Sequence, residues 1–164
     1  MYQRIVVLLV FLALVTPSPH SSALAARKPL RVSPIAIRVV ELVNVQRAAV
    51  GQPPVVLNMT LLTEAQRFSA VQARLGRLSH SGDDNSTLME RLRRAGYPCR
   101  FCAENLAAGQ ASADVVVAAW MASPGHRANI LHPQAQDIGV GFTEQTDDPS
   151  GLAQYWVMEL GRNR

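Results

Sequence analysis

Hydrophobic residues recur at helical spacing in two segments of the first half of the chain. Segment 35–50 repeats apolar side chains about every 3.6 residues, and segment 58–76 carries a longer stripe of the same period. Ser33, which is followed by proline, favours a helix start, and Gly51 and Gly76 are residues at which helices commonly end. The pattern therefore predicts one helix in each segment.

Two shorter helices are predicted further along. Thr87 and Glu90 have the spacing of a capping box, in which each side chain accepts a hydrogen bond from the other residue's backbone amide, and Gly96 is expected to end that helix. Segment 112–122 is expected to form the next helix, with its first residue as the cap and Asp114 favourably placed in its first turn.

The pattern changes in the last third of the chain, where apolar and polar positions alternate. Segments 138–142 and 153–160 have this period of two, the polar stretch QTDDPSG between them predicts a hairpin loop, and 103–109 is expected to add a short strand. Gly139 and Gly141 indicate strand positions that another segment approaches closely. Helices followed by strands, without a β-α-β rhythm, predict an α+β domain with an antiparallel sheet.

The N-terminal part has the order of a secretory signal peptide. A short positive stretch precedes an unbroken apolar run at 5–15, and Ala23-Leu24-Ala25 is a small-x-small cleavage pattern. The run is shorter than the roughly 20 apolar residues that a spanning helix needs. We therefore predict a signal peptide at 1–25, a loose arm at 26–34 and one domain at 35–164, secreted or periplasmic and without a stable membrane anchor.

The charge of the chain indicates no nucleic-acid partner. Without Arg4, 15 of the 16 basic residues remain against 12 acidic ones, a net charge of +3 spread along the chain. The densest basic cluster is interpreted as a solvated helix surface, with Glu90 pairing to arginines three and four positions later. The cluster consists of Arg91, Arg93, Arg94 and Arg100.

Cys99 and Cys102 are the only cysteines, in the stretch YPCRFC. In an exported chain a local disulfide is the first expectation. A redox pair would need the first cysteine at a helix N-terminus, and a zinc site would need two further ligands. The preceding Gly96-Tyr97-Pro98 is typical of a helix end and a turn, so we predict a structural disulfide and keep thiol chemistry and metal binding as alternatives.

The stretch WMASPGHRANIL places His126 at a turn between two helix-like runs, and His80 lies in the polar loop LSHSG. Taken alone, these could be a helix-start residue and a polar loop residue. Together with ELVNVQRAAVGQPPV, RLRRAGYP, AENLAAG, DIGVGF and YWVMELG, in this order over residues 41–160, the chain resembles the CAP superfamily of cysteine-rich secretory proteins, also called SCP domains. The resemblance is to the family's short secreted bacterial branch.

The resemblance implies a three-layer α-β-α sandwich with a central antiparallel sheet and one cleft. In the family, two histidines and two acidic residues line that cleft, which implies His80, His126 and Glu104 here. The position of the second acid, three residues after Trp120, is occupied by Ser123. We discount Glu90 as a substitute because neighbouring arginines compete for it. Asn105 is expected to tie a loop to backbone groups, and His132 is expected to lie on the surface.

Two imidazoles beside a carboxylate suit a divalent metal such as Zn²⁺. Held by His80 and His126 alone, such an ion would be bound weakly, and we expect it to leave below about pH 6.5, as protonated imidazole cannot coordinate. No cofactor is required by the pattern.

We predict a monomeric, non-enzymatic, secreted binding protein for a small hydrophobic or lipid ligand, or for an envelope or host component. The family includes members that bind sterols and fatty acids, and this carries over as implication only. The alternative is a hydrolase or peptidase that uses the cleft histidines and Glu104. Its nucleophile would be Ser79, Ser81 or Ser123, and the sequence singles out none of them.

Overall fold

A computed structural model describes residues 32–163. The predicted signal peptide at 1–25 and most of the arm therefore lie outside the described residues. The elements, in chain order, are α1 (Pro34–Ala48), β1 (Val56–Leu57), α2 (Met59–Leu75), α3 (Leu88–Arg94), β2 (Cys99–Ala108), α4 (Ala113–Ala122), α5 (Pro124–Ile130), β3 (Asp137–Glu144) and β4 (Gln154–Asn163). No helix in the described part of the chain is long and apolar enough to cross a membrane.

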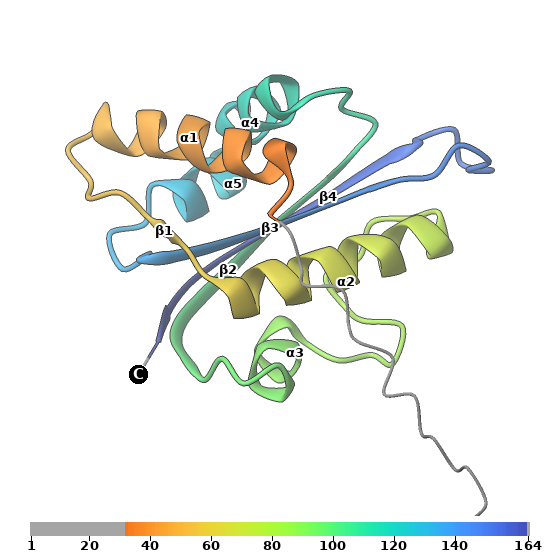
Figure 1. The fold of residues 1–164 in the computed structure, drawn as a ribbon, viewed down its shortest axis with the longest axis horizontal. Helices are drawn as coiled ribbons and strands as arrows, with labels where there is room; N and C mark the ends of the chain where they lie inside the picture. Colours follow the sequence, from red (N-terminus) through yellow and green to blue (C-terminus); the bar gives the residue numbers. More distant parts are fainter. Residues whose placement is uncertain (1–31, 164) are drawn as a thin grey trace, which may run out of the picture.

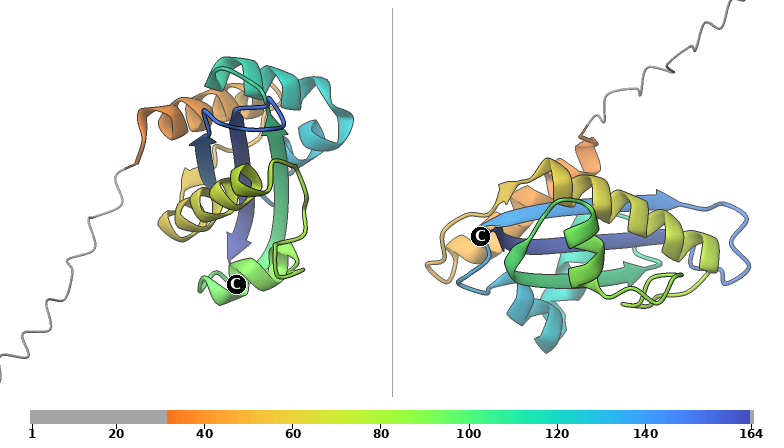
Figure 2. Two further views of the ribbon diagram at one scale, coloured as in Figure 1. Left: turned by 90° about the vertical axis from the view of Figure 1, so that its right-hand side faces the viewer. Right: turned by 90° about the horizontal axis from the view of Figure 1, so that it is seen from below.

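The sheet has the strand order β1-β3-β4-β2 and lies between two helical layers. Helices α1, α4 and α5 cover one face, and α2 and α3 cover the other (Figures 1 and 2). The expected three-layer α-β-α architecture is confirmed. The three long strands pair antiparallel, as expected, and the two-residue β1 adds a parallel pair with β3 that the sequence did not indicate.

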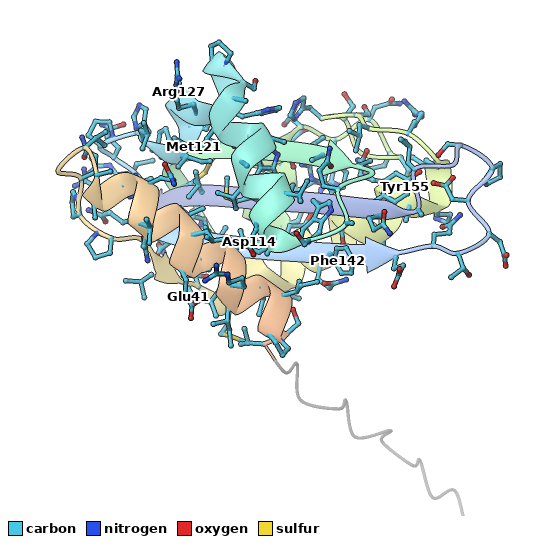
Figure 3. All side chains as sticks on the ribbon, turned by 90° about the horizontal axis from the view of Figure 1, so that it is seen from above. Glu41, Asp114, Met121, Arg127, Phe142 and Tyr155 are labelled. Atoms are coloured by element: carbon cyan, nitrogen blue, oxygen red, sulfur yellow. A yellow bond between two sulfur atoms is a disulfide. The ribbon has the colours of Figure 1, made fainter. Side chains whose placement is uncertain are left out.

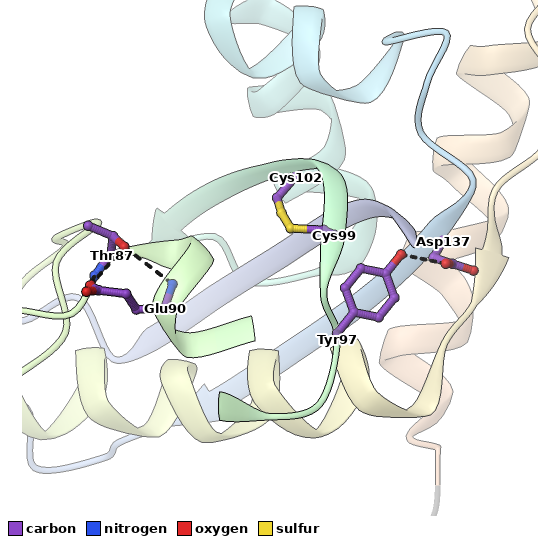
Figure 4. The surroundings of a disulfide bond; sticks show 6 residues. All are labelled: Thr87, Glu90, Tyr97, Cys99, Cys102 and Asp137. Atoms are coloured by element: carbon purple, nitrogen blue, oxygen red, sulfur yellow. Dashed lines mark hydrogen bonds between the residues drawn. A yellow bond between two sulfur atoms is a disulfide. The ribbon is translucent and has the colours of Figure 1, made fainter. Parts of the chain in front are cut away.

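The predicted helix caps are confirmed. Ser33 accepts a hydrogen bond from Ala36 N. Asn58, the first residue of the segment predicted as the second helix, accepts from the first-turn amides of α2. Gly76 ends α2 in the left-handed conformation, at φ 59°, which glycine adopts without steric cost. Thr87 and Glu90 form both halves of the capping box (Figure 4).

Alternate side chains of the central strand β4 serve two cores. Trp156, Met158 and Leu160 pack toward α1 and α4, whereas Val157 packs with α2. Gly139 and Gly141 lie directly against α2, because an added Cβ at either residue would overlap the backbone of that helix. The predicted close approach is therefore confirmed.

On the other face, α1 and α4 lie side by side over the sheet (Figure 3). Asp114, in the first turn of α4, accepts a hydrogen bond of 2.8 Å from Nη2 of Arg38 in α1. This surface ion pair joins the two helices of the outer layer above their apolar contact.

The structure confirms the Cys99–Cys102 disulfide, and strand β2 begins earlier than expected. The expected strand at 103–109 begins four residues earlier, so both cysteines lie in β2, with a register shift between Cys99 and Phe101 (Figure 4). The pair thus lacks the helix N-terminus that lowers a redox thiol's pKa. Nearby, the Tyr97 hydroxyl donates to Asp137 at the start of β3.

The interpretation of the arginine cluster as a solvated surface was wrong for Arg91, which is buried. The expected pairing of Glu90 with the following arginines is also absent from the described residues. Its carboxylate is used by the capping box, and Arg94 instead binds Asp84. Local spacing predicted the helix surface but not which of its positions faces the sheet.

Candidate functional site

The candidate cleft lies at the edge of the sheet formed by β2, which pairs only with β4. Side chains alternate along a strand, so Glu104 and Asn105, although adjacent in sequence, point to opposite faces. Glu104 points to the α2–α3 layer and Asn105 to the layer that contains α5. One dipeptide therefore holds both helical layers at the same strand edge.

Glu104 holds the ring of His80, which lies in the loop after α2. Nδ1 of His80 lies 2.8 Å from Oε1 of Glu104, whose side chain is only 2% exposed. The His80 side chain is 66% exposed, and its Nε2 has no hydrogen-bond partner among the described residues. The buried carboxylate therefore fixes the ring through one nitrogen and leaves the other available.

Arg91, in α3, forms hydrogen bonds with both members of this pair. Its Nη2 donates to Oε2 of Glu104, and its Nη1 donates to the carbonyl oxygen of His80 at 3.0 Å. One guanidinium group therefore neutralises the buried carboxylate and anchors the backbone of the loop that carries the histidine. Its planar set of donors suits such a fixed double contact.

Asn105 holds the second histidine segment. Its Nδ2 donates to the carbonyl oxygen of His126 at 3.0 Å, and its Oδ1 accepts from Asn129 at 2.9 Å. Asn129 also donates to the backbone carbonyl of Glu104. The expectation that Asn105 binds backbone groups is confirmed, and α5 is thereby fixed to β2.

The two histidines are electrostatic neighbours with opposite pKa shifts. The hydrogen bond to Glu104 raises the pKa of His80, against a smaller opposing effect of burial. Burial lowers the pKa of His126, and the positive charge of His80 lowers it further. As the pH falls, His80 therefore takes up its proton before His126.

The described residues at the cleft do not form a metal site with a complete set of ligands. Within residues 32–163 no group of three or more His, Cys, Asp or Glu side chains is placed to hold an ion. Both oxygens of Glu104 are already engaged, by His80 and Arg91. The Glu104–His80 contact is nevertheless the arrangement that orients a histidine for coordination through its other nitrogen.

Among the described residues, none of the serines considered as nucleophiles forms a hydrogen bond with the ring of His80 or His126. Ser79 Oγ accepts a hydrogen bond from the Ser81 amide, and Ser123 begins α5 without a side-chain cap bond. Across the part of the chain that is described, no serine hydroxyl is hydrogen bonded to a histidine ring. The geometry therefore does not favour a hydrolase.

Sequence reasoning missed Arg91, Glu64 and Glu159, which are all buried beside the cleft. A signal was present for each of them. Arg91 and Glu64 occupy positions on the apolar stripes of their helices, and Glu159 shares a strand face with Val157. A charged residue at a core position indicates a buried partner of opposite charge.

Comparisons with known proteins agree with this architecture. The profile of the cysteine-rich secretory protein family (CAP) matches residues 40–160. The uncharacterized protein YkwD of Bacillus subtilis is 34% identical over 116 residues, which are 71% of this chain and 45% of YkwD. The chain thus spans less than half of that relative's length.

Two solved structures have the same fold. An extracellular SCP-domain protein from Bacillus anthracis superposes with a TM-score of 0.69 at 22% identity, over 81% of this chain and 45% of that one. An outer surface protein from Borrelia burgdorferi gives 0.69 at 20% identity, over 77% of this chain and 90% of that one. With the family profile covering most of its length, this chain belongs to the cysteine-rich secretory protein family, CAP.

Proposed function

We propose that this protein is a secreted, non-enzymatic binding module whose cleft of His80, Glu104 and His126 takes a divalent metal or a small ligand. The observation that carries the proposal is the buried Glu104 carboxylate, which fixes one nitrogen of His80 and leaves the other without a partner in the described residues. Secretion is supported by the signal-peptide pattern at 1–25 and by relatives described as extracellular or outer surface proteins.

Binding is favoured over hydrolysis because the polar groups of the cleft hold one another in place. Every hydrogen bond of Glu104 holds a neighbouring group, and no hydroxyl contacts a ring nitrogen in residues 32–163. A general base would need a nucleophile within hydrogen-bond reach. The exposed edge at His80 instead offers an acceptor nitrogen to a ligand donor or to a metal ion.

A metal would be held by His80 and His126, with water completing its coordination. A bound Zn²⁺ would supply a Lewis acid to which an anionic or carbonyl ligand can bind. Glu104 would act by orienting the ring and increasing its basicity. Beyond the metal, the proposed occupant is a small or lipid ligand, or a component of the envelope or host that meets the exported protein.

The test is a titration of the purified protein with Zn²⁺ near neutral pH, followed by calorimetry. His80→Ala and His126→Ala are each expected to weaken zinc binding at least tenfold, because each variant removes one of the two proposed coordinating side chains. His132→Ala is the matched control, because that ring stacks on Phe101 and forms no hydrogen bond with His80, Glu104 or His126 among the described residues. It is expected to leave zinc binding unchanged.

The proposal fails if wild-type protein binds neither metal nor lipid, or if the cleft variants bind like wild type. Turnover of a peptide or ester substrate that disappears in His126→Ala would replace it with the hydrolase interpretation. Native mass spectrometry of the exported protein reports metal, lipid and subunit number together, and so also tests whether it is a monomer.

A further inference from the structure

A concave site lies between α2 and α3, on the face of the sheet that these helices cover (Figure 1). It is a groove of about 580 Å³. Neither histidine of the cleft lines it, and Arg91 is the residue that it shares with the cleft's support. The lining consists of Met59, Thr60, Thr63, Glu64, Arg67, Asp84, Arg91, Arg94 and Ala95.

Three arginines from two helices converge on this groove. Arg67 comes from α2, and Arg91 and Arg94 come from α3, against two acidic residues in the lining, Glu64 and Asp84. Glu104 neutralises Arg91, so Arg67 and Arg94 are left facing Glu64 and Asp84. What the groove offers a ligand therefore depends on the guanidinium N–H donors that these carboxylates do not use.

The acidic residues of the groove are already engaged. Each oxygen of Glu64 accepts from Arg67, at 2.7 and 2.8 Å. Asp84 accepts from the Ser86 amide through Oδ1 and from Arg94 through Oδ2. An incoming cation would thus have to displace an arginine, which makes the groove a poor cation site.

Guanidinium donors, by contrast, are left over. Among the described residues, Nη1 of Arg67 and both Nε and Nη2 of Arg94 make no hydrogen bond. The side chain of Arg91 is 1% exposed, and its Nε has no hydrogen-bond partner, although Oε1 of Glu64 lies 3.5 Å away. This atom is buried and ion paired with Glu64, so the donors open to a ligand are those of Arg67 and Arg94.

The position of these donors favours a tetrahedral anion. Arg67 lines the groove from α2 and Arg94 lines it from α3, so an acceptor that engages both must accept hydrogen bonds from two helices. A phosphate group does this, whereas a carboxylate presents two oxygens in one plane. The hydroxyl of Thr60 has no hydrogen bond in the described residues and adds a further donor to the lining.

We propose that the α2–α3 groove is a binding site for a phosphate group, held by Arg67 and Arg94 and independent of the histidine cleft. The phosphate can belong to a free phosphate, to a soluble phosphate ester or to a lipid headgroup. The chemistry of recognition is the same for all three, because it uses only the phosphate oxygens.

The experiment titrates the purified protein with inorganic phosphate and with glycerol 3-phosphate at low ionic strength. Arg94→Gln is expected to weaken both at least tenfold. Arg93→Gln is the matched control, since this exposed arginine is the adjacent residue of the same helix and does not line the groove. It is expected to change the affinity less than twofold.

Arg67 needs a milder replacement, because Glu64 is buried and would lose its partner in a neutral variant. Arg67→Lys keeps the charge and removes the planar donor set, so it is expected to weaken phosphate binding severalfold while its thermal midpoint stays near wild type. Amide resonances of Thr60, Thr63 and Ala95 are expected to shift on titration, and the resonance of His80 is not.

Vesicles of phosphatidylcholine with and without phosphatidylglycerol distinguish the source of the phosphate. Binding to the anionic vesicles that Arg94→Gln abolishes indicates a lipid headgroup, and soluble binding without vesicle binding indicates a free phosphate or ester. The proposal is overturned if no probe binds, or if Arg93→Gln weakens binding as much as Arg94→Gln. Zinc binding in the same variants reports the histidine cleft separately.

Discussion

At the residue scale, Arg91 has the largest share of the contacts around the cleft. It donates to the carbonyl oxygens of His80 and Ser86 and to the carboxylate of Glu104, and its guanidinium carbon lies 3.6 Å from the centre of the Phe68 ring. A buried charge of this kind is tolerated because these groups surround it, together with Glu64, whose Oε1 lies 3.5 Å from its Nε. Its replacement would leave Glu104 buried and without a counter-charge.

Arg91→Leu is therefore expected to lower the free energy of unfolding by about 3–5 kcal/mol, the usual cost of breaking a buried ion pair. Arg93→Leu, at an exposed position of the same helix, is expected to change it by less than about 0.5 kcal/mol. Urea unfolding followed by circular dichroism measures both. Equal losses in the two variants would show that the Arg91 contacts contribute little to stability.

The candidate site was predictable from the sequence only in part. The resemblance named His80, His126 and Glu104, and the structure joins His80 to Glu104 by a hydrogen bond. Asn105, expected to bind backbone groups, holds the His126 segment of α5. The ligand role of these residues stays a prediction. Arg91 was missed because it belongs to a basic cluster that was interpreted as a helix surface, although it lies on the apolar stripe of α3. The packing of α3 on the sheet shows that it is buried.

At the element scale, β2 explains why two adjacent polar residues hold segments from opposite layers. An edge strand has one free side, and its alternating side chains reach both faces, so loops from both layers can meet there. The caps of α1, α2 and α3 could be predicted because they depend on residues three positions apart. The strand β1 could not be predicted, because long-range hydrogen bonds hold it in place. The Val56 amide donates to the carbonyl oxygen of Gln136, just before β3, and the Asn58 amide donates to that of Ile138, in β3.

The contact between α2 and β3 depends on glycine. A Cβ at Gly141 would overlap the backbone of Ala65, which cannot move without shifting the helix. Gly141→Ala is therefore expected to destabilise the protein by about 3 kcal/mol, at the upper end for an overpacked core. Gly125→Ala in α5 is the control, because nothing lies within 4 Å of its added Cβ.

Thermal or urea unfolding of both glycine variants gives the comparison. Gly125→Ala is expected to be neutral or slightly stabilising, since alanine favours a helix more than glycine does. If Gly141→Ala unfolds like wild type, α2 must be able to move away from the sheet without loss.

At the scale of the whole molecule, the two faces of the sheet differ in kind. The face under α1 and α4 is packed with aliphatic and aromatic side chains, including Trp156 and Met158. The opposite face combines small apolar clusters with the buried groups Glu64, Arg91 and Glu104. Both proposed sites lie on the charged side or at its edge, where the fold already maintains polar groups out of water.

Glu159 makes the stability of this charged face depend on pH. Its carboxyl is fully buried, and neither oxygen has a hydrogen-bond partner in the described part of the chain. Burial raises its pKa well above 4.5, the nearby Glu104 and Glu64 raise it further, and Arg91 and Arg67 oppose the shift. The folded protein thus keeps a proton that the unfolded chain releases, so the free energy of unfolding falls as the pH rises above 4.5.

Glu159→Gln keeps the shape of the protonated side chain and removes its titration. The variant's free energy of unfolding relative to wild type is expected to increase as the pH rises above 4.5, by at most about 1.4 kcal/mol per pH unit. Urea unfolding at several pH values measures this trend, and a constant offset from imperfect amide packing does not affect it. Glu144→Gln, at an exposed position of β3, is expected to show no trend. A flat difference for Glu159→Gln would mean that this carboxyl has the same pKa in the folded and unfolded protein, so that the acidic neighbours and burial impose no cost on its charge.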